Sequence, residues 1–299
     1  MKHIDKKTHE HQALQLIDSF MRPRWVDANN AFTNISYDDL RDKQPGTALS
    51  YRQSLEDIIC ENQDGYCCYC MRRLGENDMK TLEHLIPDGL DGKTTPVEDV
   101  QKYNEYVDYN LPFLTRHNVE LAFVFKQNGR TSAPPYPHDI SYHNLVLSCD
   151  GKYPTGSKSR SSKTCNHHRQ QNDLCPVFYD MALSAAVEYE PSGEILARPT
   201  EPDDVKEKIA SIALATALSY DALRAIRHLW YIVRHYPMAD LEAVASSGED
   251  VDVSSFVGSV VTGQEKEDED VRSFFNNVQM WHTFLQYCWF KDYYSQRYP

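Results

Sequence analysis

Four cysteines in this 299-residue chain are spaced so that they could bind one metal ion together. Cys67 and Cys70 form a C-x-x-C pair in the segment GYCCYC, and such a pair offers two thiolates at the spacing that tetrahedral zinc accepts. Cys149 and Cys165 form a second pair, although the fifteen residues between them exceed the usual spacing of a zinc knuckle. We therefore predict one structural Zn²⁺ site made by these four residues, with Cys68 as the main alternative ligand.

Polar residues that suit hydrolytic chemistry lie between and directly after these pairs. Glu83 and His84 are adjacent in TLEHLIPDG, Asn144 lies in SYHNLVLSCD, and residues 166–169 directly follow the last cysteine of the site. An imidazole can move protons near neutral pH, and carboxylate or amide oxygens bind hard divalent cations. A lone histidine is more often structural, but the position of His84 between the two cysteine pairs favours a functional role.

The order of these motifs resembles the HNH, or ββα-metal, nuclease family in its zinc-stapled form. The resemblance consists of a carboxylate beside a histidine, an Asn-Leu strand and a Cys-Asn helix start, and it covers about residues 65–173. The wider layout, from an opening M-K-x-I-x-K through GYCCYC, EHLIP and YHNLVLSC, is similar to PtuB-type HNH proteins. Those proteins are the nuclease partners of an ABC-type ATPase in Septu and retron-linked anti-phage systems.

The resemblance implies a metal-dependent endonuclease that hydrolyses phosphodiester bonds of DNA or RNA, tRNA included. His84 would be the general base, and Asn144 would hold this histidine in orientation through its ring or its backbone. Glu83 would be a ligand of Mg²⁺ or Mn²⁺, and Asn166 or His167 would complete the protein's share of the ligands.

Details of this implied site stay open. Asn166, His167 and His168 are consecutive, so only one or two of them can face a catalytic metal, and His167 is also a candidate catalytic residue. Arg169, about one helical turn further on, is expected to contact a non-bridging phosphate oxygen. Glu83 stands where the family commonly has aspartate or histidine, and its extra methylene relative to aspartate is tolerable in a metal ligand.

Charge is unevenly distributed along the chain, whose formal net charge is −13. Residues 246–270 carry eight acidic side chains against one lysine, which is typical of a solvated, flexible linker. The segment between Cys149 and Cys165 is instead cationic, and beside the predicted site it would line the path of a phosphate backbone. The nucleic-acid contacts expected there are Lys152, Lys158, Arg160 and Lys163.

The elements that must position these residues are predicted to be mostly helical. Ser50 and Gln53 have capping-box spacing before an apolar stripe, which predicts a helix that runs to about Glu61 and leads into the first cysteine pair. Apolar residues at helical spacing predict further helices over 205–236 and 274–294. We expect an α+β protein in which a small ββα-metal HNH core with zinc-binding cysteine pairs is embedded in a mostly α-helical chain.

Three regions are expected along the chain. Residues 1–64 would be an N-terminal helical segment packed on the core, and residues 65–175 would be the nuclease core. An insertion at about 94–137, too long for a simple hairpin connection, interrupts that core and has a predicted helix near 97–106. Residues 176–299 would be a helical C-terminal region that includes the acidic stretch 246–270.

The N-terminal sequence MKHIDKKTHEHQALQ lacks the apolar core of a secretory signal, so we expect a cytoplasmic protein with reduced cysteines. No run approaches the roughly 18 apolar residues of a membrane helix, and no membrane partner is expected. The overall acidity predicts weak intrinsic affinity for polyanions, which fits a nuclease that its partner ATPase recruits or gates.

Two other classes of function compete with the nuclease hypothesis. The main alternative is a non-catalytic zinc-binding module for nucleic-acid or protein interaction, which would need zinc but neither Mg²⁺ nor Mn²⁺. A cysteine-dependent redox or transferase enzyme built around CCYC would require a thiol of low pKa near that pair.

Overall fold

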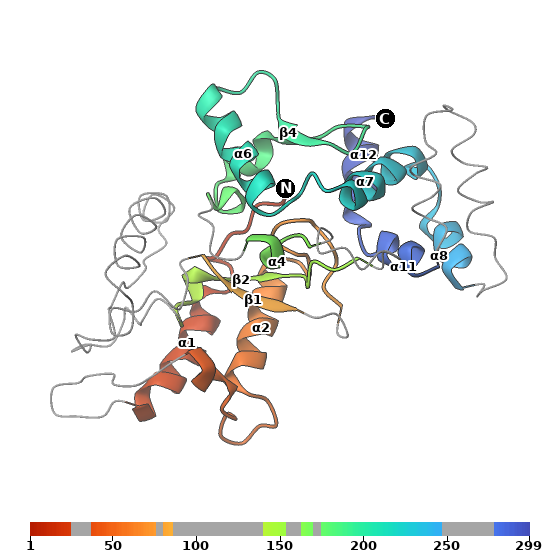
Figure 1. Cartoon of the computed structure of the whole chain (residues 1–299). Helices are drawn as coiled ribbons and strands as arrows, with labels where there is room; N and C mark the ends of the chain where they lie inside the picture. The colour runs from red at the N-terminus through yellow and green to blue at the C-terminus, as the bar shows by residue number, and fades with distance from the viewer. Residues whose placement is uncertain (25–36, 76–79, 86–139, 154–162, 170–174, 247–277) are drawn as a thin grey trace.

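A computed structural model describes residues 1–24, 37–75, 80–85, 140–153, 163–169, 175–246 and 278–299 of the chain (Figure 1). The insertion expected at 94–137, with its predicted helix near 97–106, lies outside these residues. So do Lys158, Arg160 and nearly all of the acidic stretch 246–270.

The described residues form an α+β arrangement of helices and two small antiparallel sheets (Figure 1). No helix in this part of the chain has the length and apolar character needed to cross a membrane. In chain order the elements are α1 (Glu10–Met21), η1 (Arg22–Arg24), η2 (Tyr37–Arg41), α2 (Tyr51–Asn62), β1 (Thr81–His84), η4 (Tyr142–Asn144), β2 (Leu145–Ser148), α4 (Asn166–Arg169), η6 (Val177–Tyr179), α5 (Met181–Ala186), β3 (Val187–Tyr189), β4 (Ile195–Ala197), α6 (Asp203–Ala215), α7 (Asp221–Val233), α8 (Met238–Ser246), α11 (Val278–Leu285) and α12 (Trp289–Arg297).

The helix predicted before the first cysteines is α2, and it packs against α1. Its capping box is present, because the Ser50 hydroxyl accepts a hydrogen bond from the Gln53 amide and the Gln53 side chain accepts one from the Ser50 amide at 2.9 Å. A cap of this kind typically contributes about 1 kcal/mol. Local sequence therefore determines where α2 begins, and α2 ends just before the C-x-x-C pair.

Strands β1 and β2 pair antiparallel, and β2 contacts α2. In this register Leu82 lies opposite Leu147, and His84 lies opposite Leu145. The Gln63 side chain, one residue after α2, donates to the Leu147 carbonyl at 2.9 Å and accepts from the Leu147 amide at 2.8 Å. Because both bonds hold β2 from the side of α2, the helix and the strand pair form one unit that carries the polar residues at 83, 84 and 144.

The C-terminal region contains the β3–β4 pair and a set of aromatic helices, in which α12 lies beside α7 and α11 contacts α8 (Figure 1). Trp230 of α7 stacks on Phe284 of α11 with ring centroids 4.1 Å apart, and both side chains are buried. Stacked aromatic pairs add to the free energy gained from burial alone. These aromatic side chains thus belong to the core of the C-terminal region.

Two segments predicted to be helical each contain two helices and a break. The segment 205–236 divides into α6 and α7, and the segment 274–294 contains α11 and α12 with a break at 286–288. At the first break the Thr216 carbonyl accepts from the Cys165 amide at 2.8 Å, and at the second the Gln286 carbonyl accepts from the Arg73 amide at 2.7 Å. At each break a main-chain carbonyl therefore accepts a hydrogen bond from a segment that carries or adjoins the cysteines. Helical periodicity in the sequence does not reveal these hydrogen bonds.

Lys6 is a buried cation that ties the N-terminal segment to the strand pair. Its ammonium group donates to the Leu145 carbonyl and lies 4.2 Å from the centroid of the Tyr142 ring. Burial lowers the pKa of Lys6 from its ordinary value of 10.5 to about 7, against a smaller opposing effect of Cys68. The folded protein therefore releases this proton at a lower pH than the unfolded chain does.

This difference predicts a pH dependence of stability. Between about pH 7 and pH 10 the unfolded chain binds more protons at Lys6 than the folded protein, so the free energy of unfolding should rise with pH. Lys6→Met should flatten that rise, whereas Lys7→Met, at an exposed position, should retain it. Chemical denaturation at several pH values measures both slopes, and equal slopes in wild type and Lys6→Met would contradict the prediction.

Candidate zinc centre and the polar site beside it

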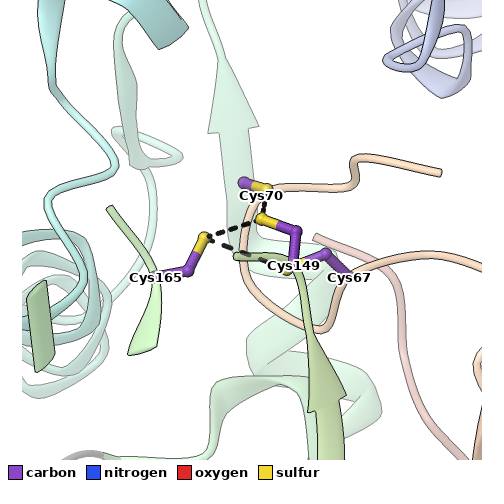
Figure 2. A group of neighbouring side chains, drawn as sticks. All are labelled: Cys67, Cys70, Cys149 and Cys165. Atoms are coloured by element: carbon purple, nitrogen blue, oxygen red, sulfur yellow. Dashed lines mark hydrogen bonds between the residues drawn. The ribbon is translucent and has the colours of Figure 1, made fainter. Parts of the chain in front are cut away.

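The four predicted cysteines converge in the buried interior, as Figure 2 shows. Their Sγ atoms all lie within 4.8 Å of one another, with separations of 3.6 Å for Cys70–Cys149, 3.7 Å for Cys149–Cys165 and 3.9 Å for Cys67–Cys165. A tetrahedron with Zn–S bonds of about 2.3 Å has edges of about 3.8 Å. The group therefore could hold a metal ion such as zinc, and Cys68 is not part of it. Zinc binding by these four residues stays a prediction.

A tight turn holds the first cysteine pair. The Cys67 amide donates to the Arg72 carbonyl at 2.8 Å, and the Met71 amide returns to the Cys67 carbonyl at 3.2 Å. Met71 adopts a left-handed backbone conformation with φ of 63°, which is uncommon for a residue with a side chain. Strain of this kind persists where the surroundings over-determine the turn, as a ligand-bearing loop does.

Cys149 and Cys165 lie close together because the residues that follow Cys149 contact the residues that precede Cys165. The Thr164 amide donates to the Gly151 carbonyl at 3.1 Å, so the intervening segment begins and ends at one point. Cys165 itself has a left-handed φ of 54°, and its amide is held by the Thr216 carbonyl. The wide spacing of Cys149 and Cys165 is thus compatible with a single site, because the cationic segment is an insertion between them.

Gly151 makes this closure possible, which leads to a test by substitution. Its φ is +60°, and an added Cβ would lie 2.2 Å from the Thr164 carbonyl oxygen. Gly151→Ala should destabilise the fold by more than the ~1–3 kcal/mol expected for a left-handed non-glycine residue. Gly46→Ala is the matched control, because Gly46 also has a left-handed φ of +76° but nothing lies within 4 Å of its added Cβ.

Chemical denaturation of the two variants separates backbone strain from the steric clash. The Gly46 variant reports the strain alone, and the excess loss in the Gly151 variant reports the clash with residue 164. Equal losses of free energy of unfolding in both variants would show that the close approach of Gly151 to Thr164 does not matter for stability.

Electrostatics at the cysteines favour a bound cation. Burial, followed by contacts with the other three cysteines, raises the pKa of the Cys165 thiol well above its usual range. Four adjacent thiolates would repel one another, and a metal ion that displaces their protons removes that repulsion. Arg72 lies beside the cluster and donates to Asp150 at 3.0 Å. Burial alone would lower the pKa of Arg72, but the surrounding acidic groups raise it, so this cation stays charged.

A chain of hydroxyl groups surrounds one side of the cysteine cluster. The Tyr287 hydroxyl lies 3.6 Å from Cys70 Sγ and 2.7 Å from the Tyr153 hydroxyl. Tyr153 in turn lies 3.3 Å from the Thr164 hydroxyl, which donates to Cys165 Sγ at 3.7 Å. Such outer contacts orient metal ligands. The sequence does not single out Tyr287, because its aromatic neighbours indicate only a helix of the core.

Glu83, predicted as a ligand of a catalytic metal, is buried with an exposed fraction of 3%. Its carboxylate accepts a hydrogen bond from the Ser148 hydroxyl at 2.9 Å. Burial raises the pKa of Glu83 to about 8, although the Ser148 contact and the Arg169 guanidinium oppose the shift. In this arrangement the carboxyl group is enclosed, whereas a site for Mg²⁺ normally keeps several water molecules.

His84 lies at the end of β1 and is partly exposed. Neighbouring residues of a strand point to opposite faces, so its ring is directed away from the Glu83 carboxylate. The ring packs edge to face on Tyr37 with centroids 4.6 Å apart. Asn144 is buried, and its carbonyl accepts from the amide of Leu85, the residue after His84, at 2.9 Å. The main chain of Asn144 is therefore adjacent to the backbone that follows His84, and the role expected of the Asn144 side chain stays a prediction.

The short helix α4 carries the remaining predicted site residues. Asn166 and His167 are half-buried and His168 is exposed. Burial, and then the charges of Lys152 and Lys163, lower the pKa of His167. Two of the four predicted cationic contacts thus lie close enough to α4 to affect a histidine there.

Arg169 departs from its expected role as a phosphate contact. Its side chain is buried with an exposed fraction of 1%, and its guanidinium donates to the carbonyls of His84 at 2.9 Å and Leu85 at 2.8 Å. It also donates to the Tyr69 hydroxyl at 3.2 Å. The reason is positional, because α4 begins directly after the buried Cys165 and its last residue is directed into the core rather than toward solvent.

Comparisons of the chain with protein-family models, with curated proteins and with solved structures gave no match.

Proposed function

We propose that this chain is a metal-dependent HNH endonuclease that cleaves phosphodiester bonds of DNA or RNA. One observation carries the proposal: the segments with the polar motifs meet at the end of β1. Arg169 of α4 donates to the His84 carbonyl at 2.9 Å, while the Asn144 carbonyl accepts from the Leu85 amide at 2.9 Å. With β1, β2 and α4 in that order beside a four-cysteine cluster, the arrangement supports a zinc-stapled ββα-metal core.

In this proposal His84 acts as the general base, because its imidazole is partly exposed and can accept a proton from a water molecule near neutral pH. The main-chain carbonyl of Asn144 holds the backbone beside His84, which keeps the end of the strand in register. His167 and Asn166 provide donor atoms on the facing helix. Neither residue is fully buried, so both can reach a substrate or an ion.

The divalent cation that the proposal includes, Mg²⁺ or Mn²⁺, would supply charge neutralisation at the phosphate. Asn166 and His167 are half-buried, and their side chains carry donor atoms that could bind such an ion. Glu83 does not fit it in the arrangement described, because its carboxylate is enclosed and bound by Ser148. We therefore assign no step of the reaction to Glu83 and do not include it among the proposed ligands.

Charge supports nucleic acid as the substrate class. Lys152 and Lys163 are exposed at the two ends of the cationic segment, and both act electrostatically on His167. Cations beside the candidate site would attract a phosphate backbone and would confer little sequence preference. Lys158 and Arg160, between them in sequence, are proposed to extend the same contact.

The proposal also includes a partner. The chain as a whole carries a formal charge of −13, which disfavours unassisted binding to a polyanion. We propose that it is the effector subunit of an anti-phage complex in which an ABC-type ATPase recruits or gates the nuclease. This part rests on the resemblance of the motif layout.

The test is a cleavage assay with purified full-length chain on supercoiled plasmid DNA and on total tRNA, in Mg²⁺ or Mn²⁺, with and without any co-purifying ATPase. Cleavage of one substrate by wild type and not by His84→Ala would support the proposal and identify the substrate class. No cleavage even with the ATPase, or equal cleavage by both proteins, would contradict it.

One observation favours a second candidate function, a non-catalytic zinc-binding interaction module. The cysteine cluster is complete, whereas Glu83 and Arg169 are both enclosed. This alternative expects about one zinc per chain and binding to a nucleic acid or protein that does not depend on Mg²⁺ or Mn²⁺. The same assay separates the two functions, because only the nuclease needs both the divalent ion and His84.

A further inference from the structure

Arg169 connects the cysteine cluster to the main chain of the candidate base. On one side, its amide donates to the Cys165 carbonyl at 2.9 Å, and its guanidinium donates to the hydroxyl of Tyr69, which lies inside the first cysteine pair. On the other side, the same guanidinium donates to the carbonyls of His84 and Leu85. One buried residue thus contacts both metal-binding segments and the end of β1.

The geometry of a guanidinium suits this connection. Its planar fork presents donors in fixed directions, so two carbonyls bound by it are held relative to each other. The pairing of β1 with β2 ends at His84. Beyond this residue, other contacts must hold the main chain in place. The Leu85 amide, bound to the Asn144 carbonyl, is the last such contact that the described residues provide on this side.

The acceptors of Arg169 also argue against a phosphate contact. An arginine that clamps a phosphate must present donors to an open surface, whereas this side chain is 1% exposed and donates to two carbonyls and a hydroxyl. A buried guanidinium that lost these acceptors would leave uncompensated polar groups in the core, which destabilises the fold. The contacts are therefore part of the folded state.

We propose that Arg169 is a positioning residue that makes the geometry of the His84 backbone depend on metal occupancy of the cysteine cluster, through Tyr69 and Cys165. The proposal rests on the proposed function only in that it treats His84 as the base. When the metal leaves, the two cysteine segments are released, Arg169 loses its fixed support, and the main chain at 84–85 becomes free to move.

The experiment uses the full-length chain and three variants: Arg169→Lys, Tyr69→Phe and the control Arg297→Lys. Arg297 is an exposed arginine of α12 that pairs with Glu188 at 3.0 Å. For each protein we would measure the zinc content and the hydrogen exchange of the Leu85 amide. We would also measure kcat and KM for the substrate that the cleavage assay identifies. The Arg224 amide, bound to the Tyr220 carbonyl in the C-terminal region, is the reference for exchange that does not involve β1.

We expect Arg169→Lys to keep about one zinc per chain while the Leu85 amide exchanges at least about 10-fold faster. Loss of an outer contact of this kind typically lowers activity about 10- to 100-fold, and here the loss should fall on kcat with little change in KM. Lysine retains the positive charge but lacks the planar guanidinium that binds both carbonyls. It should therefore not restore the wild-type exchange rate of the Leu85 amide. Tyr69→Phe should weaken the response of Leu85 exchange to zinc removal, and the Arg297 variant should match wild type.

Two results would overturn the inference. A higher KM and a shallower salt dependence in Arg169→Lys, with kcat unchanged, would identify a phosphate contact instead. Leu85 exchange that responds to zinc removal no more than Arg224 exchange would show that the cluster and the base are not coupled. If wild type cleaves nothing, the proposed function fails, yet the exchange measurements still decide this inference. If Arg169→Lys does not fold, Tyr69→Phe decides it, since that variant removes a single hydroxyl.

Discussion

Cys67→Ala is expected to abolish zinc binding and to lower the unfolding temperature sharply, whereas Cys68→Ala, at the next position, should retain the metal. Both thiols are buried, but only Cys67 belongs to the group of four whose Sγ atoms lie within 4.8 Å. Removing one ligand leaves three buried thiols that cannot complete a tetrahedron. The comparison separates metal ligation from burial, because the two variants remove the same atoms from adjacent buried positions.

The expected magnitudes are far apart. Structural zinc contributes directly to folding free energy, so a loss of at least about 4 kcal/mol is expected for Cys67→Ala, or a fall of roughly 8–16 °C in Tm. Cys68→Ala should cost only about 1 kcal/mol, the typical effect of a small truncation. Metal analysis and thermal unfolding with and without a chelator measure both effects. Comparable zinc loss in the two variants would refute the four-cysteine site.

His84→Ala should lower the cleavage rate by about 100- to 10,000-fold, the usual contribution of a general base, with zinc content unchanged. The side chain is partly exposed at the end of a strand and packs on one aromatic ring, so its loss should leave the fold intact. Single-turnover cleavage in Mg²⁺ or Mn²⁺ measures the rate. His11→Ala, at an exposed position of α1, is the matched control.

The outcome for His84 is informative in either direction. A large loss of rate with normal zinc content and normal thermal unfolding would assign proton transfer to this imidazole. A loss of less than about 3-fold, well below the range for a general base, would remove His84 from that role. It would also favour the zinc-binding interaction module, in which the Glu-His pair has only a structural function.

The residue types and local spacing determined several features of this protein. The Ser50–Gln53 capping box sets the start of α2, because a cap involves groups only three residues apart. The apolar run at 145–147 forms most of β2, and the two cysteine pairs come together as a group that could hold a metal ion such as zinc, whose donor set they match. These features depend on short-range geometry or on the chemistry of a ligand, and both are visible in a sequence.

The tertiary structure alone decided where other residues lie. Arg169, predicted to face a phosphate, is instead directed at the His84 carbonyl, 85 residues away in sequence. The breaks after α6 and α11 give their carbonyls to Cys165 and Arg73, and Tyr287 reaches Cys70 across 217 residues. Buried donors and acceptors must find partners wherever the folded chain supplies them, and local periodicity carries no record of those distant partners.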